Sequence, residues 1–220
     1  MKPFFKFCFG VLFISIGLSS FGQSEADSLT SDPSKKSFEL ALNKSRFNVN
    51  EVKCLADIYY GLYHTSPDSA FNLASGLVFI SRKSGDDYSL FKSLIFLAGS
   101  KERKGEIIGA RTLSNEAKRI AGIDPELKGD ALFGLGRSFA KTDDYDVSIS
   151  CFFEVLSLFE SVQDSISMFR CRYNIAGNYF NFSLFDKTRE NIDRAEQIGE
   201  RLNNDQLRPS LTLFRMKKNT

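Results

Sequence analysis

The feature that most constrains the fold of this chain is a set of positions that recurs about every 40 residues. Frames that begin at residues 51, 91, 129 and 169 are offset by 40, 38 and 40 residues. In the 129 frame the recurring positions are apolar, aromatic or small: Leu132, Leu135, Gly136, Phe139, Tyr145, Ser148, Phe152 and Val155. The 169 frame begins with Arg172 and continues with similar residues: Ile175, Ala176, Tyr179, Phe185, Thr188, Ile192 and Ala195. A fixed period of this length predicts a stacked array in which each repeat is one supersecondary unit.

Each unit is predicted to be a pair of helices. From about residue 50 the apolar residues recur at helical spacing, and no stretch alternates as a strand would. Helix caps and breakers punctuate the chain regularly, at Ser66-Pro67-Asp68, Gly85-Asp86-Asp87, Gly122-Ile123-Asp124-Pro125, Thr142-Asp143-Asp144 and Asn203-Asn204-Asp205. These signals predict an all-α chain of roughly eight helices, each about 14 to 19 residues long, joined by short turns.

The motif between Leu135 and Val155 resembles the tetratricopeptide repeat family. That family has a bulky residue, then Leu-Gly-x-x-Tyr, an aromatic residue after the turn and two later small positions, and "LGRSF…Y…S…F…V" follows this pattern. The resemblance covers 51–205 and implies a right-handed α-solenoid of about four helix-turn-helix repeats, at 51–90, 91–128, 129–168 and 169–208. The repeats of this chain are offset by 38 to 40 residues, whereas the family's period is about 34, and they lack the proline that usually closes a repeat of the family. The extra residues are expected to lengthen the helices. The chain is in this respect similar to the long-helix arrays of exported histidine kinase sensor regions and of some bacterial transcription regulators.

Two glycines, Gly134 and Gly136, interrupt an otherwise good helix pattern. Each costs about 1 kcal/mol of helix propensity relative to alanine. The resemblance implies that Gly136, like Ala98 and Ala176 in the neighbouring frames, lies where the two helices of a repeat cross closely. Gly134 falls on the predicted inner face, where a side chain is optional. A phosphate-binding loop is the weaker interpretation, because no strand precedes the glycines and no Gly-Lys motif follows them.

The N-terminus predicts export. Lys2 and Lys6 accompany an apolar run that continues to Leu18, and small residues suit a cleavage near Gly22-Gln23, so 1–22 is predicted to be a signal peptide. A membrane anchor is the alternative, but a spanning helix needs about 20 apolar residues. We therefore expect a periplasmic or secreted protein with no stable membrane span after cleavage. Two flanking segments are also predicted: a polar linker with a short leading helix at 23–50, and a terminal helix or the start of a fifth repeat at 206–220.

Composition argues against nucleic-acid binding and against catalysis. The chain has 29 Lys+Arg and 27 Asp+Glu, and loss of the two signal lysines leaves a neutral protein without a broad basic surface. His64 is the only histidine and is predicted at a helix end, so zinc clusters and Ser-His-Asp or Cys-His sites have no candidate. The pairs Asp86-Asp87 and Asp143-Asp144 fall in turns, where aspartate caps helices, and KERK at 101–104 is interpreted as a solvated charge run. We expect no enzyme activity, no cofactor and no metal.

Three cysteines follow the predicted signal peptide: Cys54, Cys151 and Cys171. Export permits disulfides, but the odd number leaves one thiol over. Cys151 and Cys171 are offset by about 9 Å along two neighbouring predicted helices, whereas a disulfide needs Cα atoms within about 7 Å of each other. We therefore interpret all three as buried apolar thiols.

The tetratricopeptide resemblance implies a ligand groove on the concave side, lined by the first helix of each repeat. Carried onto this chain, the lining positions are aromatic, basic or amide: Tyr59, Tyr63, Lys92, Phe96, Arg103, Phe133, Arg137, Lys141, Arg170, Tyr173, Asn174, Phe180 and Asn181. Glu102 and Asp130 are the acids of the same face. Tyr and Arg dominate binding hot spots, although solvated surface equally explains part of this set. The family's lysine and asparagine carboxylate clamp is not reproduced, because its positions hold Leu55 and Tyr59.

These observations favour an exported, non-catalytic scaffold that binds a protein or peptide in its concave groove. A peptide with acidic and apolar residues would suit Phe133 and the guanidinium groups of Arg137 and Arg170. On this interpretation Arg137→Glu weakens binding and barely changes stability. The alternative is a sensory input module detached from a two-component histidine kinase or transcription regulator. The residues specify neither the partner nor the oligomeric state.

Overall fold

The computed structural model describes residues 49–202 of the chain. The predicted signal peptide, the predicted leading helix at 38–47 and the predicted terminal segment at 206–220 lie outside these residues. Helix α3 (Val49–Thr65) begins two residues before the first repeat frame, inside the range predicted to be linker.

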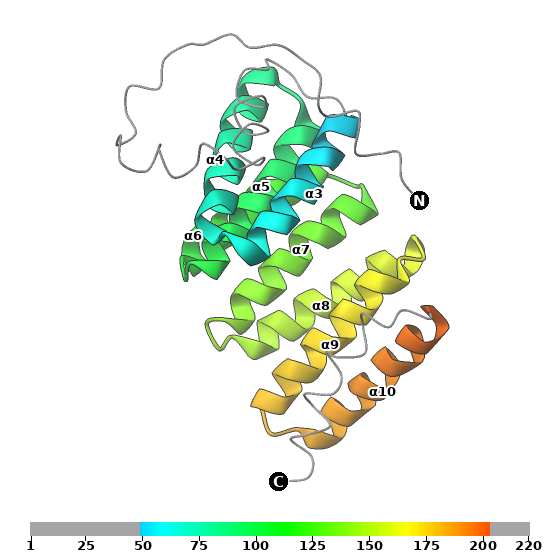
Figure 1. The fold of residues 1–220 in the computed structure, drawn as a ribbon. Coiled ribbons are helices and arrows are strands. Elements are labelled where there is room, and N and C mark those ends of the chain that lie inside the picture. The colour runs from blue at the N-terminus through cyan, green and yellow to red at the C-terminus, as the bar shows by residue number, and fades with distance from the viewer. Residues whose placement is uncertain (1–48, 203–220) are drawn as a thin grey trace.

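The described residues form eight helices and no strand. After α3 come α4 (Pro67–Ser84), α5 (Asp87–Arg103), α6 (Ile107–Ala121), α7 (Pro125–Ala140), α8 (Tyr145–Ser161), α9 (Ser165–Asn181) and α10 (Phe185–Leu202). Each helix packs on the next one in the chain, and the first helices of successive pairs also contact one another, α3 on α5, α5 on α7 and α7 on α9. The pairs stack in order from α3–α4 to α9–α10 (Figure 1), which confirms the expected all-α solenoid of helix-turn-helix repeats.

The turns repeat with the same period as the sequence pattern. In each of the last three pairs the internal turn contains a residue with positive φ: Gly105, Asp143 and Ser183, which are 38 and 40 residues apart. Aspartate side chains accept backbone N–H bonds at the start of α5, α7 and α9: Asp86, Asp124 and Asp164. The capping role predicted for the first aspartate pair is therefore confirmed at Asp86, whereas Asp144 at the start of α8 makes no capping side-chain bond.

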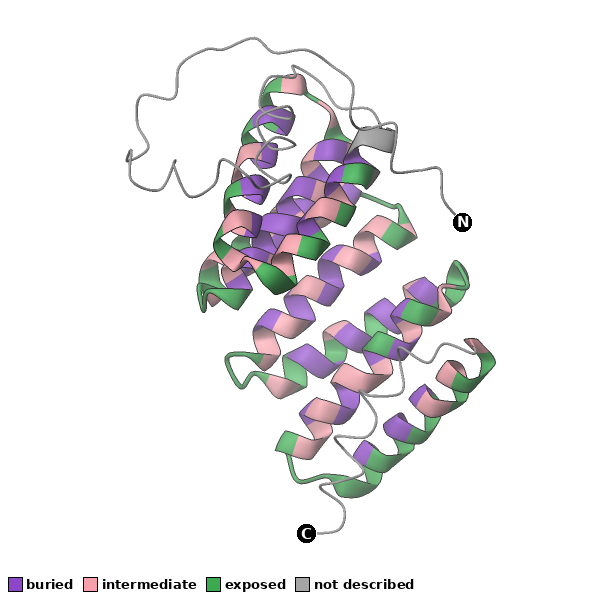
Figure 2. Ribbon diagram, in the orientation of Figure 1, coloured by how far each residue is buried: buried purple, intermediate pink, exposed green. Residues whose placement is uncertain are grey.

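Apolar side chains are buried in three clusters that follow one another along the array. The first cluster joins α3 to α6 and reaches α7, the second joins α7 to α9, and the third joins α9 to α10. On α8 the side chains of Ile149, Phe152, Val155, Leu156 and Phe159 are buried. Helix α10 is buried along one side and polar along the other (Figure 2).

Gly136 marks a close crossing of α7 and α8, which confirms the prediction for this position. A Cβ atom there would lie 3.0 Å from Cζ of Phe152, whose side chain is fully buried. Ser148 donates from Oγ to the Gly136 carbonyl at 2.7 Å, and Asn178 of α9 donates from Nδ2 to the same Oγ at 2.7 Å. The alanines at the equivalent positions of the 91 and 169 frames are also buried. The missing side chain therefore lets an aromatic ring and a buried polar chain join three helices.

The prediction of three buried thiols is wrong for Cys54, which is exposed. Cys171 is fully buried in the cluster of α7–α9, and Cys151 is half-buried on α8. These two cysteines do not form a disulfide. Burial raises the pKa of the Cys171 thiol to about 12.

We expect Cys171 to be unreactive in the folded protein. With a pKa of about 12, roughly one thiol in ten thousand is ionised at pH 8, and the thiolate is the reactive form. Iodoacetamide treatment at pH 8, followed by peptide mass analysis, should modify Cys54 and leave Cys171 intact until urea unfolds the array. Equal labelling of both cysteines in the native protein would contradict the burial of Cys171.

Candidate functional site

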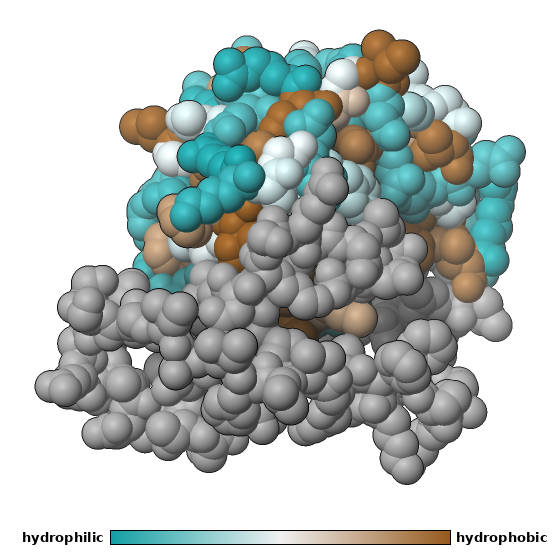
Figure 3. All heavy atoms as spheres, turned by 90° about the horizontal axis from the view of Figure 1, so that it is seen from above, coloured by the Kyte–Doolittle hydropathy of each residue, from teal (hydrophilic) through white to brown (hydrophobic). Residues whose placement is uncertain are grey.

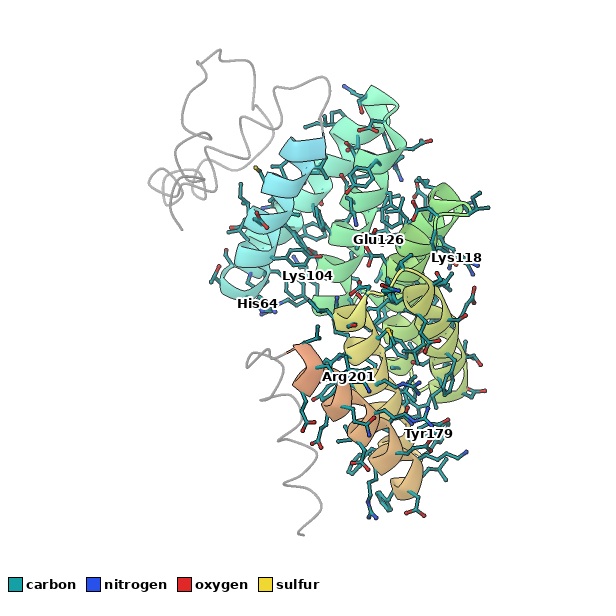
Figure 4. All side chains as sticks on the ribbon, turned by 90° about the vertical axis from the view of Figure 1, so that its right-hand side faces the viewer. His64, Lys104, Lys118, Glu126, Tyr179 and Arg201 are labelled. Carbon is teal, nitrogen blue, oxygen red and sulfur yellow. The ribbon has the colours of Figure 1, made fainter. Side chains whose placement is uncertain are left out.

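An open cavity of about 410 Å³ lies where the first helices face one another. The first helices α3, α5, α7 and α9 provide most of its lining: Tyr59, Tyr60, Tyr63, His64, Ile95, Phe96, Ala98, Gly99, Glu102, Asp130, Phe133, Gly134, Arg137 and Arg170. The second helix α6 adds Ala110 and Ser114. In Figure 4 His64 projects from the end of α3 on the opposite side of the array from Lys118 of α6.

One wall of the cavity is aromatic and is held by a buried hydroxyl. Tyr59 stacks on Phe96 with ring centroids 4.5 Å apart, and Tyr60 meets both rings edge-on. The Tyr59 hydroxyl donates to the Phe96 carbonyl at 2.7 Å and lies 3.2 Å from Ser100 Oγ. Burial raises the pKa of Tyr59, so this hydroxyl stays a neutral donor. Tyr59 and Phe96 are only 2% and 3% exposed, so the apolar surface that this wall presents to a ligand is mainly that of Tyr60, which is 54% exposed.

Two reciprocal ion pairs brace α5 against α7. Arg137 of α7 reaches back to Glu102 of α5, with Nη2 2.7 Å from Oε1, and Lys92 of α5 reaches forward to Asp130 of α7, with Nζ 3.0 Å from Oδ2. The Glu102 side chain is only 7% exposed. Burial by itself lowers the pKa of Arg137, but the attraction of Glu102 outweighs it and the pKa is raised. Both acids of the cavity are therefore neutralised within the protein.

Two further arginines at the cavity lie on aromatic rings. The Cζ atom of Arg170 on α9 is 4.6 Å from the ring centroid of Phe133, and that of Arg103 is 5.0 Å from the ring centroid of Tyr63. Both arginines are exposed, and within residues 49–202 neither forms an ion pair with a carboxylate. The rings hold these cations in place by cation–π contact, so the cavity keeps a positive charge that a ligand can reach.

Ala110 and Ser114 of the second helix α6 also line the cavity, although they are only 2% and 1% exposed. Small residues make this possible. A Cβ atom added at Gly99 would lie 3.0 Å from the Tyr59 hydroxyl, and one added at Gly134 would lie 2.9 Å from Ser114 Oγ. A side chain at Gly134 is therefore less free than expected, because it would require the Ser114 hydroxyl to rotate away.

Six of the predicted groove residues line this cavity: Tyr59, Tyr63, Phe96, Phe133, Arg137 and Arg170. Two more border it, since Lys92 pairs with the lining residue Asp130 and Arg103 lies on the ring of Tyr63. The structure places both Tyr59 and Tyr63 on the side of α3 that lines the cavity. The structure thus places six of the predicted first-helix residues in the lining and two beside it, and that they bind a ligand stays a prediction.

The other five predicted residues do not line the cavity: Lys141, Tyr173, Asn174, Phe180 and Asn181. Lys141 and Asn181 are exposed at the ends of α7 and α9. Tyr173 packs on the α9–α10 cluster, the ring of Phe180 lies 5.8 Å from that of Phe185, and Asn174 donates to the Arg170 carbonyl. The reason is their position along the array: the cavity is centred on α5 and α7, whereas these residues belong to the last helix pair or to a helix end.

Some lining residues had no counterpart in the sequence prediction. Tyr60 and His64 are four residues apart on α3 and share one face, so the same helical spacing applied one residue later would have found them. Ala110 and Ser114 belong to a second helix, and no local signal shows that a second helix is reached between α5 and α7. Their contribution depends on the spacing of two helices that are far apart in sequence.

The KERK run is only partly solvated, which corrects its interpretation. Glu102 is buried against Arg137, Arg103 lies on the Tyr63 ring, and Lys104 pairs with Asp68 at 2.9 Å. Successive residues of a helix point in different directions. The residues at the end of α5 therefore contact three different places: Arg137 in the cavity, the ring of Tyr63, and Asp68 of the neighbouring helix α4.

Across residues 49–202 no group of three His, Cys, Asp or Glu side chains could hold a metal ion. In the same range none of the helices combines the length and the apolar character that a bilayer crossing requires. On the face seen in Figure 3 the apolar side chains are interspersed with hydrophilic ones.

An inner layer of first helices with a groove between successive repeats defines a tetratricopeptide-like helical repeat protein. No protein-family model and no curated protein matches the chain. Among solved structures, apo RapI matches with a TM-score of 0.61 and 12% identity, over 82% of this chain and 62% of that one. Aspartyl phosphate phosphatase F from Bacillus subtilis matches with a TM-score of 0.64 and 13% identity, over 76% of this chain and 45% of that one.

A third similar structure contains the nearly identical TPR-like repeats of a kinesin light chain-type protein from Podospora anserina. It matches with a TM-score of 0.57 and 14% identity, over 82% of this chain and 88% of that one. Identities this low show the fold alone. The chain spans less than two thirds of the length of RapI and of phosphatase F.

Proposed function

We propose that this chain is a non-catalytic scaffold that binds a protein or peptide segment in the cavity between its first helices. The cavity is the observation that supports the proposal. Its volume of about 410 Å³ falls within the range of roughly 300 to 1,000 Å³ that is usual for ligand sites. Helical repeat arrays commonly use such concave surfaces for binding.

The chemistry of the lining favours a peptide over a charged small molecule. Tyr59, Tyr60 and Tyr63 form one aromatic group on α3, Phe133 faces them from α7, and Arg170 lies on Phe133. Tyr and Arg are the side chains that carry most of the free energy at protein interfaces. The internal ion pairs leave the walls rigid and the binding surface formed before a ligand arrives, which reduces the entropy lost on binding.

Arg170→Glu should weaken peptide binding by more than tenfold, equivalent to about 1.4 kcal/mol. The probes are decapeptides selected against the full chain from a random displayed library, and their affinity is measured by fluorescence anisotropy. Stability should change by about 1 kcal/mol at most, because Arg170 is exposed and loses only a cation–π contact. Arg170 suits this test better than Arg137, which is engaged with Glu102.

The matched control is Arg119→Glu. Arg119 is an exposed arginine in the last turn of the second helix α6 and is not part of the cavity lining. This substitution should leave the affinity of the selected peptides unchanged. Loss of binding in Arg119→Glu with normal binding in Arg170→Glu would place the site on the second helices and reject the groove.

We also propose that the chain is exported and acts in the periplasm or outside the cell. The support is the apolar run up to Leu18 and the small residues before Gln23. N-terminal sequencing of the protein recovered from a bacterial periplasm or medium should begin near Gln23. A product that keeps Met1 and sediments with membranes would favour an anchor instead.

A further inference from the structure

Residues of the second helix α6 contribute to the cavity together with the first helices. Ala110 and Ser114 line it, and a side chain on Gly134 would meet the Ser114 hydroxyl there. Aromatic rings on α3 and α5 and the ring of Phe133 on α7 line the same cavity. Aromatic rings beside small residues offer a place for one bulky apolar side chain of a ligand.

Among the charged side chains that line this cavity, both acids have an ion-pair partner, whereas Arg170 forms no ion pair within the described residues. Glu102 and Asp130 are each paired with a basic side chain of the neighbouring first helix. Arg170 keeps its guanidinium on the ring of Phe133 and has no carboxylate within ion-pair distance among the described residues. The guanidinium group of Arg170 is therefore available to a ligand. A carboxylate complements it best, because the two carboxylate oxygens can accept two parallel N–H bonds from the planar guanidinium.

We propose that the ligand of this cavity places one bulky apolar side chain between α5 and α7 and a carboxylate beside it on Arg170. The inference rests on the proposed peptide-binding function and specifies the chemistry of the bound segment. The carboxylate has two possible sources, an acidic side chain next to the apolar residue or the C-terminus of the partner chain. Both present the same group to Arg170, and the test separates them.

The test uses short fluorescein-labelled peptides and the full chain. One amidated octapeptide carries Phe-Glu in a Ser-Gly background, a second carries Phe-Gln and a third carries Ala-Glu. Two further peptides end in Phe, one with a free carboxylate and one amidated. The Phe-Glu peptide or the free-carboxylate peptide should bind about tenfold tighter than its amide counterpart, and whichever pair shows the preference identifies the source. The Ala-Glu peptide should bind at least as weakly as Phe-Gln.

The residue that reads the carboxylate is tested with Arg170→Gln. In this variant the acid and amide peptides should bind alike, whereas in Arg119→Gln the preference should persist. Equal binding of acid and amide peptides to the unmodified protein would overturn the carboxylate assignment while peptide binding stands. A preference that survives Arg170→Gln would overturn the role of Arg170. Failure of these peptides and of library-selected peptides to bind would reject the proposed function itself.

The position of the apolar side chain has its own readout. With p-benzoylphenylalanine in place of the phenylalanine, photo-crosslinking should join the peptide to α6 at 107–118, because Ala110 and Ser114 of that helix line the cavity. Crosslinks confined to α9 and α10 would overturn the assignment of the pocket.

Discussion

Gly136→Leu should lower the free energy of unfolding by about 3 kcal/mol, at the upper end of what overpacking usually costs. A Cβ atom at this position already lies 3.0 Å from the ring of the fully buried Phe152, and three more carbons have no space between α7 and α8. Moving α8 away would also lengthen the hydrogen bond from Ser148 to the Gly136 carbonyl. Urea unfolding followed by circular dichroism measures the change.

The matched control is Gly61→Leu on α3. Gly61 is also a helical glycine, but a Cβ atom added there would meet nothing within 4 Å. Leucine has the better helix propensity, so this variant should gain up to about 1 kcal/mol. A comparable loss at both positions would show that the effect belongs to leucine and not to the crossing. Unchanged stability in Gly136→Leu would mean that α7 and α8 can separate without penalty.

The repeat architecture could be predicted because each of its determinants is local or periodic. The small position at Gly136 recurs with the repeat, and so do turn positions such as Gly105 and Asp143, whose backbone has positive φ. Caps such as Asp124 act within three residues of themselves. These features depend on neighbours in the chain or on the helix partner of the same repeat, so the sequence carries them directly.

The groove was predicted less completely because it depends on contacts between repeats. The resemblance to tetratricopeptide repeats was enough to place Tyr63 and Phe133 on the inner side. It could not show that Arg137 is paired with Glu102, because the two residues are 35 positions apart and belong to different repeats. A basic residue on an inner face fits equally well as a ligand contact and as half of an internal ion pair. The distance between α5 and α7 decides between these roles.

The Arg137→Glu substitution tests this difference directly and reverses the expectation from sequence, which was a change within about 0.5 kcal/mol for an exposed charge. Glu102 is 7% exposed, and its Oε1 lies 2.7 Å from Arg137 Nη2. The variant removes the cation and sets a second carboxylate against the first. Breaking a buried ion pair costs roughly 3 to 5 kcal/mol. We expect a loss near the lower value, because the Arg137 side chain is itself 32% exposed.

The pH dependence and two further variants separate this mechanism from a general loss of packing. Two facing carboxylates raise the pKa of one of them in the folded state, so the deficit should be largest at neutral pH and should shrink as the pH falls through that raised pKa. Adding Glu102→Gln to Arg137→Glu should recover most of the stability, as a double-mutant cycle would show. Arg170→Glu, the same substitution at an arginine without an ion pair, should cost about 1 kcal/mol at most. A deficit that is equal at pH 5 and pH 8, or that persists with Glu102→Gln, would mean that the Arg137 side chain stabilises the array through its packing and not through its charge.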